Sequence, residues 1–228
     1  MPNNKRFIIS LGGSLIVPDE LDLKFLKSFK NIIEKAVARK KSFLIITGGG
    51  RTSRKYSEAA KALRCLNPTD LDWLGIHSTR LNGHLLRTIF RKYAHPRIIT
   101  NPKIKNTAVE PIIIAAGYRP GWSTDYVAVL LAKKYNIKTI LNLSNIDYVY
   151  DKDPNKNKNA QPYKQLSWDQ FRKIVGNKWD PGLNAPFDPV ASRLAQKLGL
   201  RVIIMNGRKL QNLKGFLLNT KAVGTVIS

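Results

Sequence analysis

The feature that most constrains this chain is an apolar run that stops at three consecutive glycines. The β-favouring residues Phe43–Ile46 lead through Thr47 into Gly48, Gly49 and Gly50, and a helix-compatible segment follows. Glycines permit a positive φ and let the backbone approach a ligand closely. The N-terminus of a helix behind them offers free N–H groups and the positive end of a dipole, which favour phosphate. The segment is therefore predicted to be a phosphate-binding corner or, alternatively, a tight β-to-α turn without a ligand.

Two further segments repeat this order of strand, small-residue loop and helix. Phe7–Leu11 has the pattern of a buried strand and ends at residues 12–14, which read Gly-Gly-Ser. Pro111–Ala116 is a second buried strand and ends at the loop of residues 117–125, after which a helix capped by Ser123 or Thr124 is expected. Parallel strands present their carboxyl ends at one edge of a sheet, where α/β proteins bind ligands. Three such corners together predict a site for a phosphate-rich ligand.

The alternation of strands and helices predicts the fold class. Helical spacing of Leu23, Leu26, Phe29, Ile33 and Val37 places an apolar helix between the first two strands. Such βαβ order favours a mainly parallel sheet between two layers of helices. We expect one α/β domain over residues 1–228, a three-layer αβα sandwich.

The remaining elements follow from the same patterns. Further helices are predicted to end near residue 64 and to span residues 71–93, 125–134, 168–175, 188–198 and 210–217. Further strands are predicted at residues 97–100, 138–143, 201–205 and 223–227, with a hairpin over 144–154, a polar loop at 157–163 and a loop near ligand at 176–187.

The long helix at 71–93 carries two stripes. Its apolar stripe is predicted to consist of Leu74, Leu81, Leu85 and Ile89. Its basic stripe consists of Arg80, His84, Arg87 and Arg91, which is either a solvated face or a contact with another subunit or with nucleic acid.

Composition limits the function classes. Lys and Arg number 39 against 15 Asp and Glu, so the net charge is +24, and a nucleic acid partner is possible as a secondary role. Cys65 is the one cysteine, which excludes an intrachain disulfide and a cysteine-based zinc site and fits a cytoplasmic protein. No run approaches the roughly 20 apolar residues of a membrane span, and the first residues do not resemble a signal peptide.

Taken in their order along the chain, these motifs resemble those of the amino acid kinase superfamily and, within it, those of the uridylate (UMP) kinases of the archaeal type. The resemblance covers about residues 7–227. It rests on the glycine turns together with residues 72–76 (Asp-Trp-Leu-Gly-Ile), 79–82 (Thr-Arg-Leu-Asn), 119–125 (Arg-Pro-Gly-Trp-Ser-Thr-Asp), 145–154 and 188–191 (Asp-Pro-Val-Ala).

The resemblance implies transfer of the γ-phosphoryl group of ATP to the phosphate of UMP, with Mg²⁺, to give UDP. It places Gly49 at the acceptor phosphate, Gly50 and Arg54 between donor and acceptor, and Asp72 at the acceptor nucleoside. The acceptor would be wrapped by Tyr118, Arg119, Pro120, Gly121, Trp122, Ser123 and Thr124, with Thr124 near the phosphate.

On the donor side the resemblance implies two groups of contacts with ATP. The residues under the transferring phosphoryl would be Ser10, Leu11, Gly12, Gly13 and Ser14. The residues on the base and ribose side would be Ser144, Asn145, Tyr150 and Asp153. Asp125 would orient cationic groups and, with Arg54, Ser10 and Gly13, would form the catalytic set; no side chain is assigned as a metal ligand. The acceptor lobe would cover about residues 1–135 and the ATP lobe about 136–228, and relatives imply a homo-oligomer, a dimer or a hexamer.

Three positions depart from the family pattern. Ser10 stands where many relatives have a lysine, Arg193 replaces a second lysine, and Tyr148 replaces a glycine. A hydroxyl cannot stabilise transferring charge as an ammonium does. Lys5, Arg51 or Lys55 are candidates for the missing charge.

Two alternatives remain open at the level of sequence. One is a related kinase that phosphorylates another small phosphate or carboxylate. The other is a catalytically weak protein that binds nucleotide or nucleic acid, which Ser10, Tyr148 and the net charge of +24 would favour.

Overall fold

The computed structural model describes residues 6–104, 108–154, 156–176, 178, 185–219 and 223–228. Lys5 and most of the predicted loop at 176–187 lie outside these residues. The helices are α1 (Gly13–Ile16), α2 (Leu23–Ala38), α3 (Gly50–Leu63), α4 (Pro68–Ile89), α5 (Thr124–Lys134), α6 (Trp168–Val175), α7 (Pro189–Lys197) and α8 (Leu210–Leu217). The strands are β1 (Arg6–Leu11), β2 (Ser42–Thr47), β3 (Ile112–Ala115), β4 (Thr139–Ser144), β5 (Val149–Tyr150), β6 (Pro162–Tyr163), β7 (Gln165–Leu166), β8 (Arg201–Asn206) and β9 (Thr225–Ile227).

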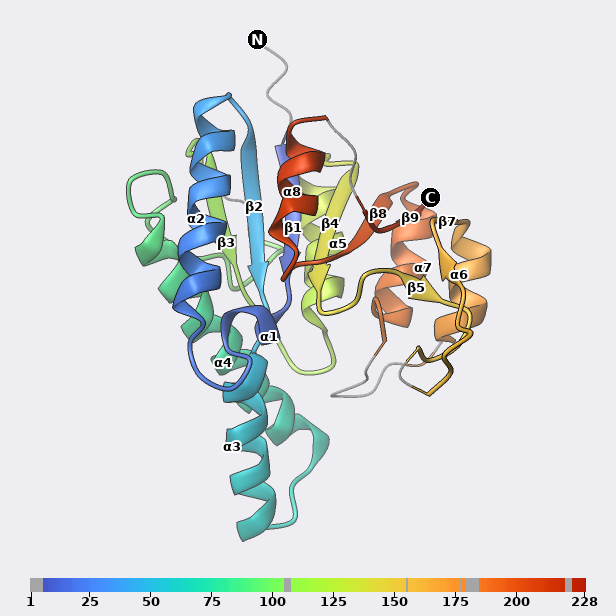
Figure 1. The fold of residues 1–228 in the computed structure, drawn as a ribbon. Helices are drawn as coiled ribbons and strands as arrows, with labels where there is room; N and C mark the ends of the chain where they lie inside the picture. Colours follow the sequence, from blue (N-terminus) through green and yellow to red (C-terminus); the bar gives the residue numbers. More distant parts are fainter. Residues whose placement is uncertain (1–5, 105–107, 155, 177, 179–184, 220–222) are drawn as a thin grey trace.

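A seven-stranded sheet with the order β3-β2-β1-β4-β8-β9-β7 forms the centre of the molecule (Figure 1). All neighbouring pairs are parallel except β8 and β9, which run antiparallel. The chain leaves β1 toward β2 and β3 on one side and returns through β4 on the other. The order therefore reverses between β1 and β4, and the carboxyl ends of these strands flank the crevice where such sheets bind ligands.

Helices cover both faces of this sheet, which confirms the predicted three-layer α/β architecture. One core joins the sheet to α2, α4 and α8, with Phe29, Ile33 and Phe90 fully buried. The other core lies beneath α5, α6 and α7, where Phe171 and Phe187 are fully buried. Helix α3 buries none of its residues and extends beyond the carboxyl edge of the sheet (Figure 1).

Local sequence signals fix several helix ends. The side chains of Asp22, Asn67 and Ser123 each accept a hydrogen bond from a backbone N–H in the first turn of α2, α4 and α5. Helices α6 and α8 have the predicted bounds. Helix α4 starts three residues before the predicted start, because Asn67 followed by Pro68 is a strong N-terminal signal.

The predicted strand at residues 97–100 is wrong. Only Ile99 forms a bridge, to Ala115, through hydrogen bonds from Ile99 N to Ile114 O and from Ala116 N to Ile99 O. Pro96 precedes this segment, and a proline has no backbone N–H to extend a ladder.

The hairpin predicted within residues 144–154 is also wrong. The segment contains β5, but its antiparallel partner is β6, which lies in the predicted polar loop. The short strand β7, which pairs with β9, was not predicted. Two-residue strands have no periodicity that a sequence pattern can reveal.

The predicted apolar stripe of α4 is only partly correct, because Leu85 and Ile89 pack against the core but Leu81 does not. Leu81 is 63% exposed, whereas Thr79, Asn82 and Leu86 are buried. The helix turns this partly polar face toward the glycine corners, where backbone carbonyl and N–H groups need hydrogen-bond partners. Leu23 is a similar error, because it lies in the first turn of α2 and is 73% exposed.

Within the described residues, every helix is too short or too polar to traverse a lipid bilayer.

Replacing Phe29 with alanine tests the core beneath α2. Phe29 stacks on Phe25 with ring centroids 5.7 Å apart and meets Phe90 edge-on at 6.1 Å. We expect Phe29→Ala to lower the free energy of unfolding, measured in urea, by about 3–5 kcal/mol, because it leaves a cavity. The control Leu23→Ala in the same helix should change it by no more than about 0.5 kcal/mol. Equal losses for both variants would contradict the assignment of α2's buried face.

Candidate functional site

The first two glycine corners touch each other at the carboxyl ends of β1 and β2. A Cβ atom at Gly13 would collide with the backbone of Gly48 and Gly50, and one at Gly48 would lie 2.5 Å from the nitrogen of Gly13. Gly48 N donates to Leu11 O at 2.9 Å, and Gly50 has a φ of +66°. These glycines are needed because two backbone segments pack with no side chain between them.

The first corner also joins β4, on the other side of β1. Gly12 N donates to Leu143 O at 2.8 Å, and Gly207 N donates to Ser144 O at 2.8 Å. The predicted donor residues at 10–14 and Ser144 thus lie at neighbouring strand ends. The site spans the point where the strand order reverses.

Helix α4 holds the second and third corners through residues that the site prediction omitted. Asn82 Nδ2 donates to Gly48 O at 2.8 Å and to Gly49 O at 3.2 Å. Thr79 Oγ1 accepts from Gly117 N at 2.8 Å, and Arg80 donates to the carbonyl oxygens of Gly117 and Tyr118. Arg80 is therefore not simply part of a solvated basic face.

The signal for these residues was the Thr-Arg-Leu-Asn motif at 79–82, which contributed to the resemblance. Its spacing alone did not reveal that Thr79 and Asn82 point to the glycine corners, because their partners are 30 or more positions away in the sequence.

A cleft of about 510 Å³ opens between the second and third corners. Predicted site residues that line it are Gly49, Gly50, Arg54, Asp72, Trp122, Ser123 and Thr124. Glycine N–H groups, an arginine and a carboxylate therefore share one cavity, as a ligand with a phosphate and a polar body requires.

The loop of residues 117–123 is braced at its tip. Gly121 N donates to Asp72 Oδ2 at 2.6 Å. The Trp122 ring packs edge-on against Tyr118 and Tyr126, and the Arg119 guanidinium lies 4.6 Å from the centroid of the Trp122 ring. These contacts fix Trp122 as one wall of the cleft.

Asp125 lies beside the first corner and next to a second aspartate, Asp188. Ser10 Oγ donates to Asp125 Oδ1 at 2.9 Å, and Asp188 N donates to Asp125 Oδ2 at 3.2 Å. Burial and the neighbouring Asp188 carboxylate raise the pKa of Asp125 to about 6, although both hydrogen bonds lower it. Among the described residues, no cation forms an ion pair with Asp125.

Asp188 was predicted as a helix start, and the structure gives it that role as well. Its Oδ1 accepts from Val190 N and Ala191 N at the start of α7. The sequence could not reveal its closeness to Asp125, because tertiary packing of α5 against α7 brings the two together.

The cations suggested as substitutes for the missing lysine point elsewhere. Arg51 pairs with Glu58 at 3.0 Å and lies 3.6 Å from Asp19, and Lys55 pairs with Glu20 at 2.8 Å. Neither lines the cleft. Arg193, on α7, is exposed.

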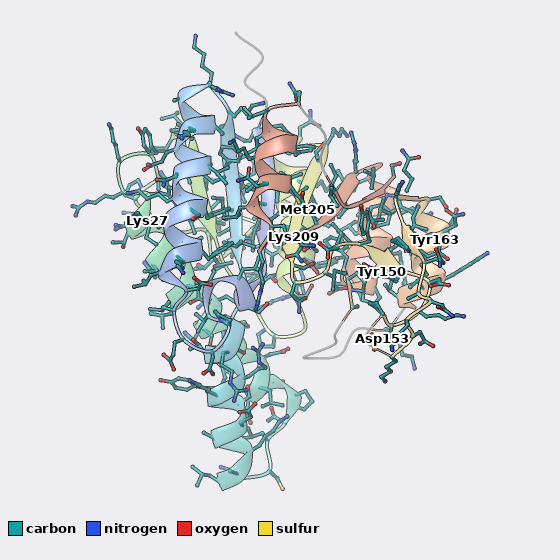
Figure 2. All side chains as sticks on the ribbon, viewed as in Figure 1. Lys27, Tyr150, Asp153, Tyr163, Met205 and Lys209 are labelled. Carbon is teal, nitrogen blue, oxygen red and sulfur yellow. The ribbon has the colours of Figure 1, made fainter. Side chains whose placement is uncertain are left out.

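The remaining donor-side residues lie apart from the cleft. Tyr150 is in β5, and Figure 2 shows Tyr150 and Asp153 on the side of the molecule that holds β5, α6 and α7, away from α3. Tyr148 meets Tyr150 edge-on at 6.4 Å, and Asp147 pairs with Lys209 at 2.8 Å. Asn145 follows the end of β4.

No group of three His, Cys, Asp or Glu side chains within the described residues is arranged to hold a metal ion. Two of the three histidines have other contacts: His95 Nδ1 lies 3.0 Å from Glu110, and the His77 ring lies 5.9 Å from that of Trp73.

Comparison with known proteins gives consistent matches over nearly the whole chain. The model of the amino acid kinase family matches residues 5–206. A uridylate kinase of Thermoplasma volcanium is 34% identical, with 98% of each chain covered. A uridylate kinase of Pyrococcus abyssi is 32% identical, with 90% of this chain and 91% of the relative covered. The crystal structure of uridylate kinase from Archaeoglobus fulgidus is similar with a TM-score of 0.81 and 28% identity, covering 97% of this chain and 99% of that one.

The pKa of Asp125 predicts a pH-dependent stability. The folded chain holds the Asp125 proton up to a pH of about 6, whereas an unfolded aspartate loses it near 3.9. Ionisation therefore costs stability as pH rises from about 4 to 6, and Asp125→Asn, which keeps the volume, removes that cost. We expect the free energy of unfolding of Asp125→Asn, relative to the unmodified chain, to rise by roughly 1–3 kcal/mol between pH 4 and pH 7.5 in urea titrations. A difference that does not change with pH would contradict the raised pKa.

Proposed function

Because this chain belongs to the amino acid kinase family, we propose that it is a uridylate kinase that transfers the γ-phosphoryl group of ATP to UMP and forms UDP. The observation that carries the proposal is the shared cleft. It combines the N–H-rich glycine corner with Arg54 for a phosphate and Asp72 with Trp122 for a nucleoside. Phosphoryl transfer needs positioning and charge neutralisation more than covalent chemistry, and these groups supply both.

In this proposal UMP occupies the cleft. Its phosphate meets the N–H groups at Gly49 and Thr124, and Asp72 accepts hydrogen bonds from the nucleoside. The rest of the loop, Tyr118–Ser123, closes over the acceptor, which the bracing of Trp122 by Arg119 supports. No general base is required, because the attacking group is already a phosphate anion.

ATP would approach from the first corner. Its transferring phosphoryl would lie over the loop of residues 10–14, next to Gly50 and Arg54, and its base and ribose would contact Ser144, Asn145, Tyr150 and Asp153. The contact between Gly13 and the backbone of Gly48 and Gly50 supports a short distance between donor and acceptor phosphates. On this basis residues 1–135 form the acceptor lobe and residues 136–228 the ATP lobe.

The residues near the phosphates fit Mg²⁺ that enters with ATP rather than a metal bound by the protein alone. Asp125 and Asp188 each already accept two internal hydrogen bonds, which compete with coordination of a resident ion. Mg²⁺ commonly takes one or two carboxylates and several phosphate oxygens. When bound, it would neutralise charge on the ATP phosphates.

Because position 10 holds a serine and not a lysine, it supplies no positive charge to the transferring phosphoryl group. The Ser10 hydroxyl carries no charge and instead donates a hydrogen bond to Asp125. Arg54 is then the main protein cation between donor and acceptor, and its contribution to the rate should be large.

We also propose that copies of the chain associate through the face of α3 and α4. Tyr56 and Leu81 are each 63% exposed and line a hollow of about 560 Å³ with Leu21 and Leu85. Burying such a patch in a dimer is favourable.

A coupled assay with ATP and Mg²⁺ over UMP, CMP, dUMP and carbamate tests the function. We expect turnover of UMP to exceed that of the other acceptors, because the cleft has polar groups for both the phosphate and the nucleoside. Preferred turnover of carbamate would indicate a related small-molecule kinase. Absence of turnover with every acceptor would refute the proposal.

Replacing Arg54 with alanine should reduce kcat/KM for UMP about 100-fold or more, because it removes a charged donor from the developing transition state. The matched control is Arg51→Ala, one turn earlier in α3, because Arg51 does not line the cleft and its guanidinium pairs with Glu58. It should remain within about threefold of the unmodified enzyme. Comparable losses in both variants would assign Arg54 a structural role only.

A further inference from the structure

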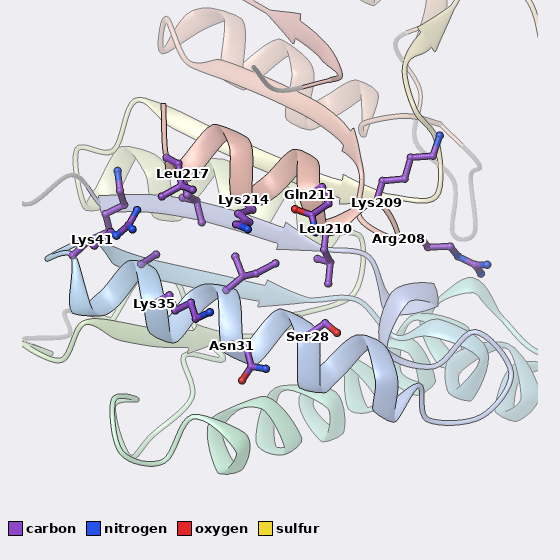
Figure 3. Close-up of a pocket in the computed structure, with 14 residues that line it drawn as sticks. Ser28, Asn31, Lys35, Lys41, Arg208, Lys209, Leu210, Gln211, Lys214 and Leu217 are labelled. Atoms are coloured by element: carbon purple, nitrogen blue, oxygen red, sulfur yellow. The ribbon is translucent and has the colours of Figure 1, made fainter. Parts of the chain in front are cut away.

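A second cavity, of about 820 Å³, lies away from the kinase cleft, between α2 and α8. Both helices pack on the same face of the sheet, and the cavity is a groove between them (Figure 3). Its α2 wall runs from Ser28 to Arg39, which is about 17 Å at the rise of an α-helix. The groove shares no lining residue with the cleft assigned to UMP.

The groove is strongly basic. Its cationic side chains are Lys35, Arg39, Lys41, Arg208, Lys209 and Lys214. None of the described residues that line it is acidic. Lys209 pairs with Asp147, and the other five take part in no ion pair among the described residues.

These charges are distributed along the whole groove. Figure 3 shows Lys41 at one end, Lys35 and Lys214 from opposite helices in the middle, and Arg208 and Lys209 at the other end. The other lining residues are uncharged. Five are apolar, Ile32, Ala36, Leu210, Leu217 and Leu218, and three are polar, Ser28, Asn31 and Gln211. A long groove with cations at intervals suits an extended polyanion better than a single compact anion.

Helix capping does not account for this set. Arg39 and Lys41 follow the C-terminus of α2, where cations are favourable. Arg208 and Lys209 instead precede the first turn of α8, where the helix dipole disfavours positive charge. Like charges on both walls repel one another, and a bound polyanion relieves that repulsion.

We propose that this groove binds single-stranded nucleic acid by its phosphate backbone, independently of sequence. At 3.4 Å or more per nucleotide, its length accommodates roughly three to five consecutive phosphates. No aromatic side chain is among the described lining residues, so the stacking that gives base preference is missing.

The proposed binding of nucleic acid is separate from the kinase reaction and involves different residues. It also gives part of the net charge of +24 a physical role. Arg208 follows Gly207, whose N–H bonds Ser144 at the proposed ATP site, so the groove ends next to the kinase site without entering it.

The test is fluorescence anisotropy with a labelled 12-nucleotide oligouridylate, with saturating UMP to block the kinase cleft. We expect binding whose log K falls with log salt at a slope of about −3.5, as five phosphate contacts predict for a single strand. This corresponds to about a 100-fold loss between 50 and 200 mM salt. A DNA oligomer of equal length should bind within about threefold, because the backbone carries the interaction.

Two triple variants of equal net charge separate the groove from general electrostatics. Lys35→Gln, Arg39→Gln and Lys214→Gln together should weaken binding at least tenfold and reduce the salt slope by about 2. The control combines Lys24→Gln, Lys27→Gln and Lys133→Gln, which are exposed and do not line the groove. It should change binding less than twofold, and both variants should keep their thermal midpoint and kinase rate.

Equal weakening by the two triple variants would overturn the proposal, since net charge alone would then explain binding. So would an unchanged salt slope in the groove variant. Displacement of the oligomer by inorganic triphosphate at equal phosphate concentration would assign the groove to small anions instead.

Discussion

The contact between the two N-terminal glycine corners is the constraint on which the site depends. Gly13 packs on the backbone of Gly48 and Gly50, so the carboxyl ends of β1 and β2 meet without an intervening side chain. Any Cβ at Gly13 would push the corners apart and separate the donor and acceptor phosphates of the proposed reaction. Asn82, which bonds the carbonyl oxygens of Gly48 and Gly49, holds this contact from the side of α4.

Electrostatics distinguish the two parts of the surface that we assign to phosphate. At the proposed kinase site a carboxylate pair, Asp125 and Asp188, lies beside a glycine loop, and Ser10 donates a hydrogen bond to Asp125. In the groove between α2 and α8, Lys35 and Lys214 lie on opposite walls, and no acidic residue is among the described lining. Precise placement of few charges suits catalysis, whereas many charges along a groove suit a polymer.

Much of the fold could be predicted because it rests on local patterns. The strands at the glycine corners, the helices α6 and α8, and the caps at Asp22 and Ser123 follow from periodicity and from residues that satisfy a helix end. The predictions fail where the orientation of a residue depends on a partner that is distant in the sequence. Leu81 looks like core but is exposed, since α4 turns Thr79 and Asn82 toward backbone groups that lie 30 or more positions away.

The sequence by itself determined the α/β class, the three glycine corners and seven of the sixteen residues that line the cleft, because strand–glycine–helix order and helix-start signals are encoded within short windows. Only the tertiary structure decided which polar groups meet. The pairing of Ser10 with Asp125, the nearness of Asp188, the diversion of Arg51 and Lys55 to acidic partners and the basic groove all arise from packing between elements far apart in the chain. Hydrogen bonds and charges act over a few ångströms of space, and a linear pattern does not contain that distance.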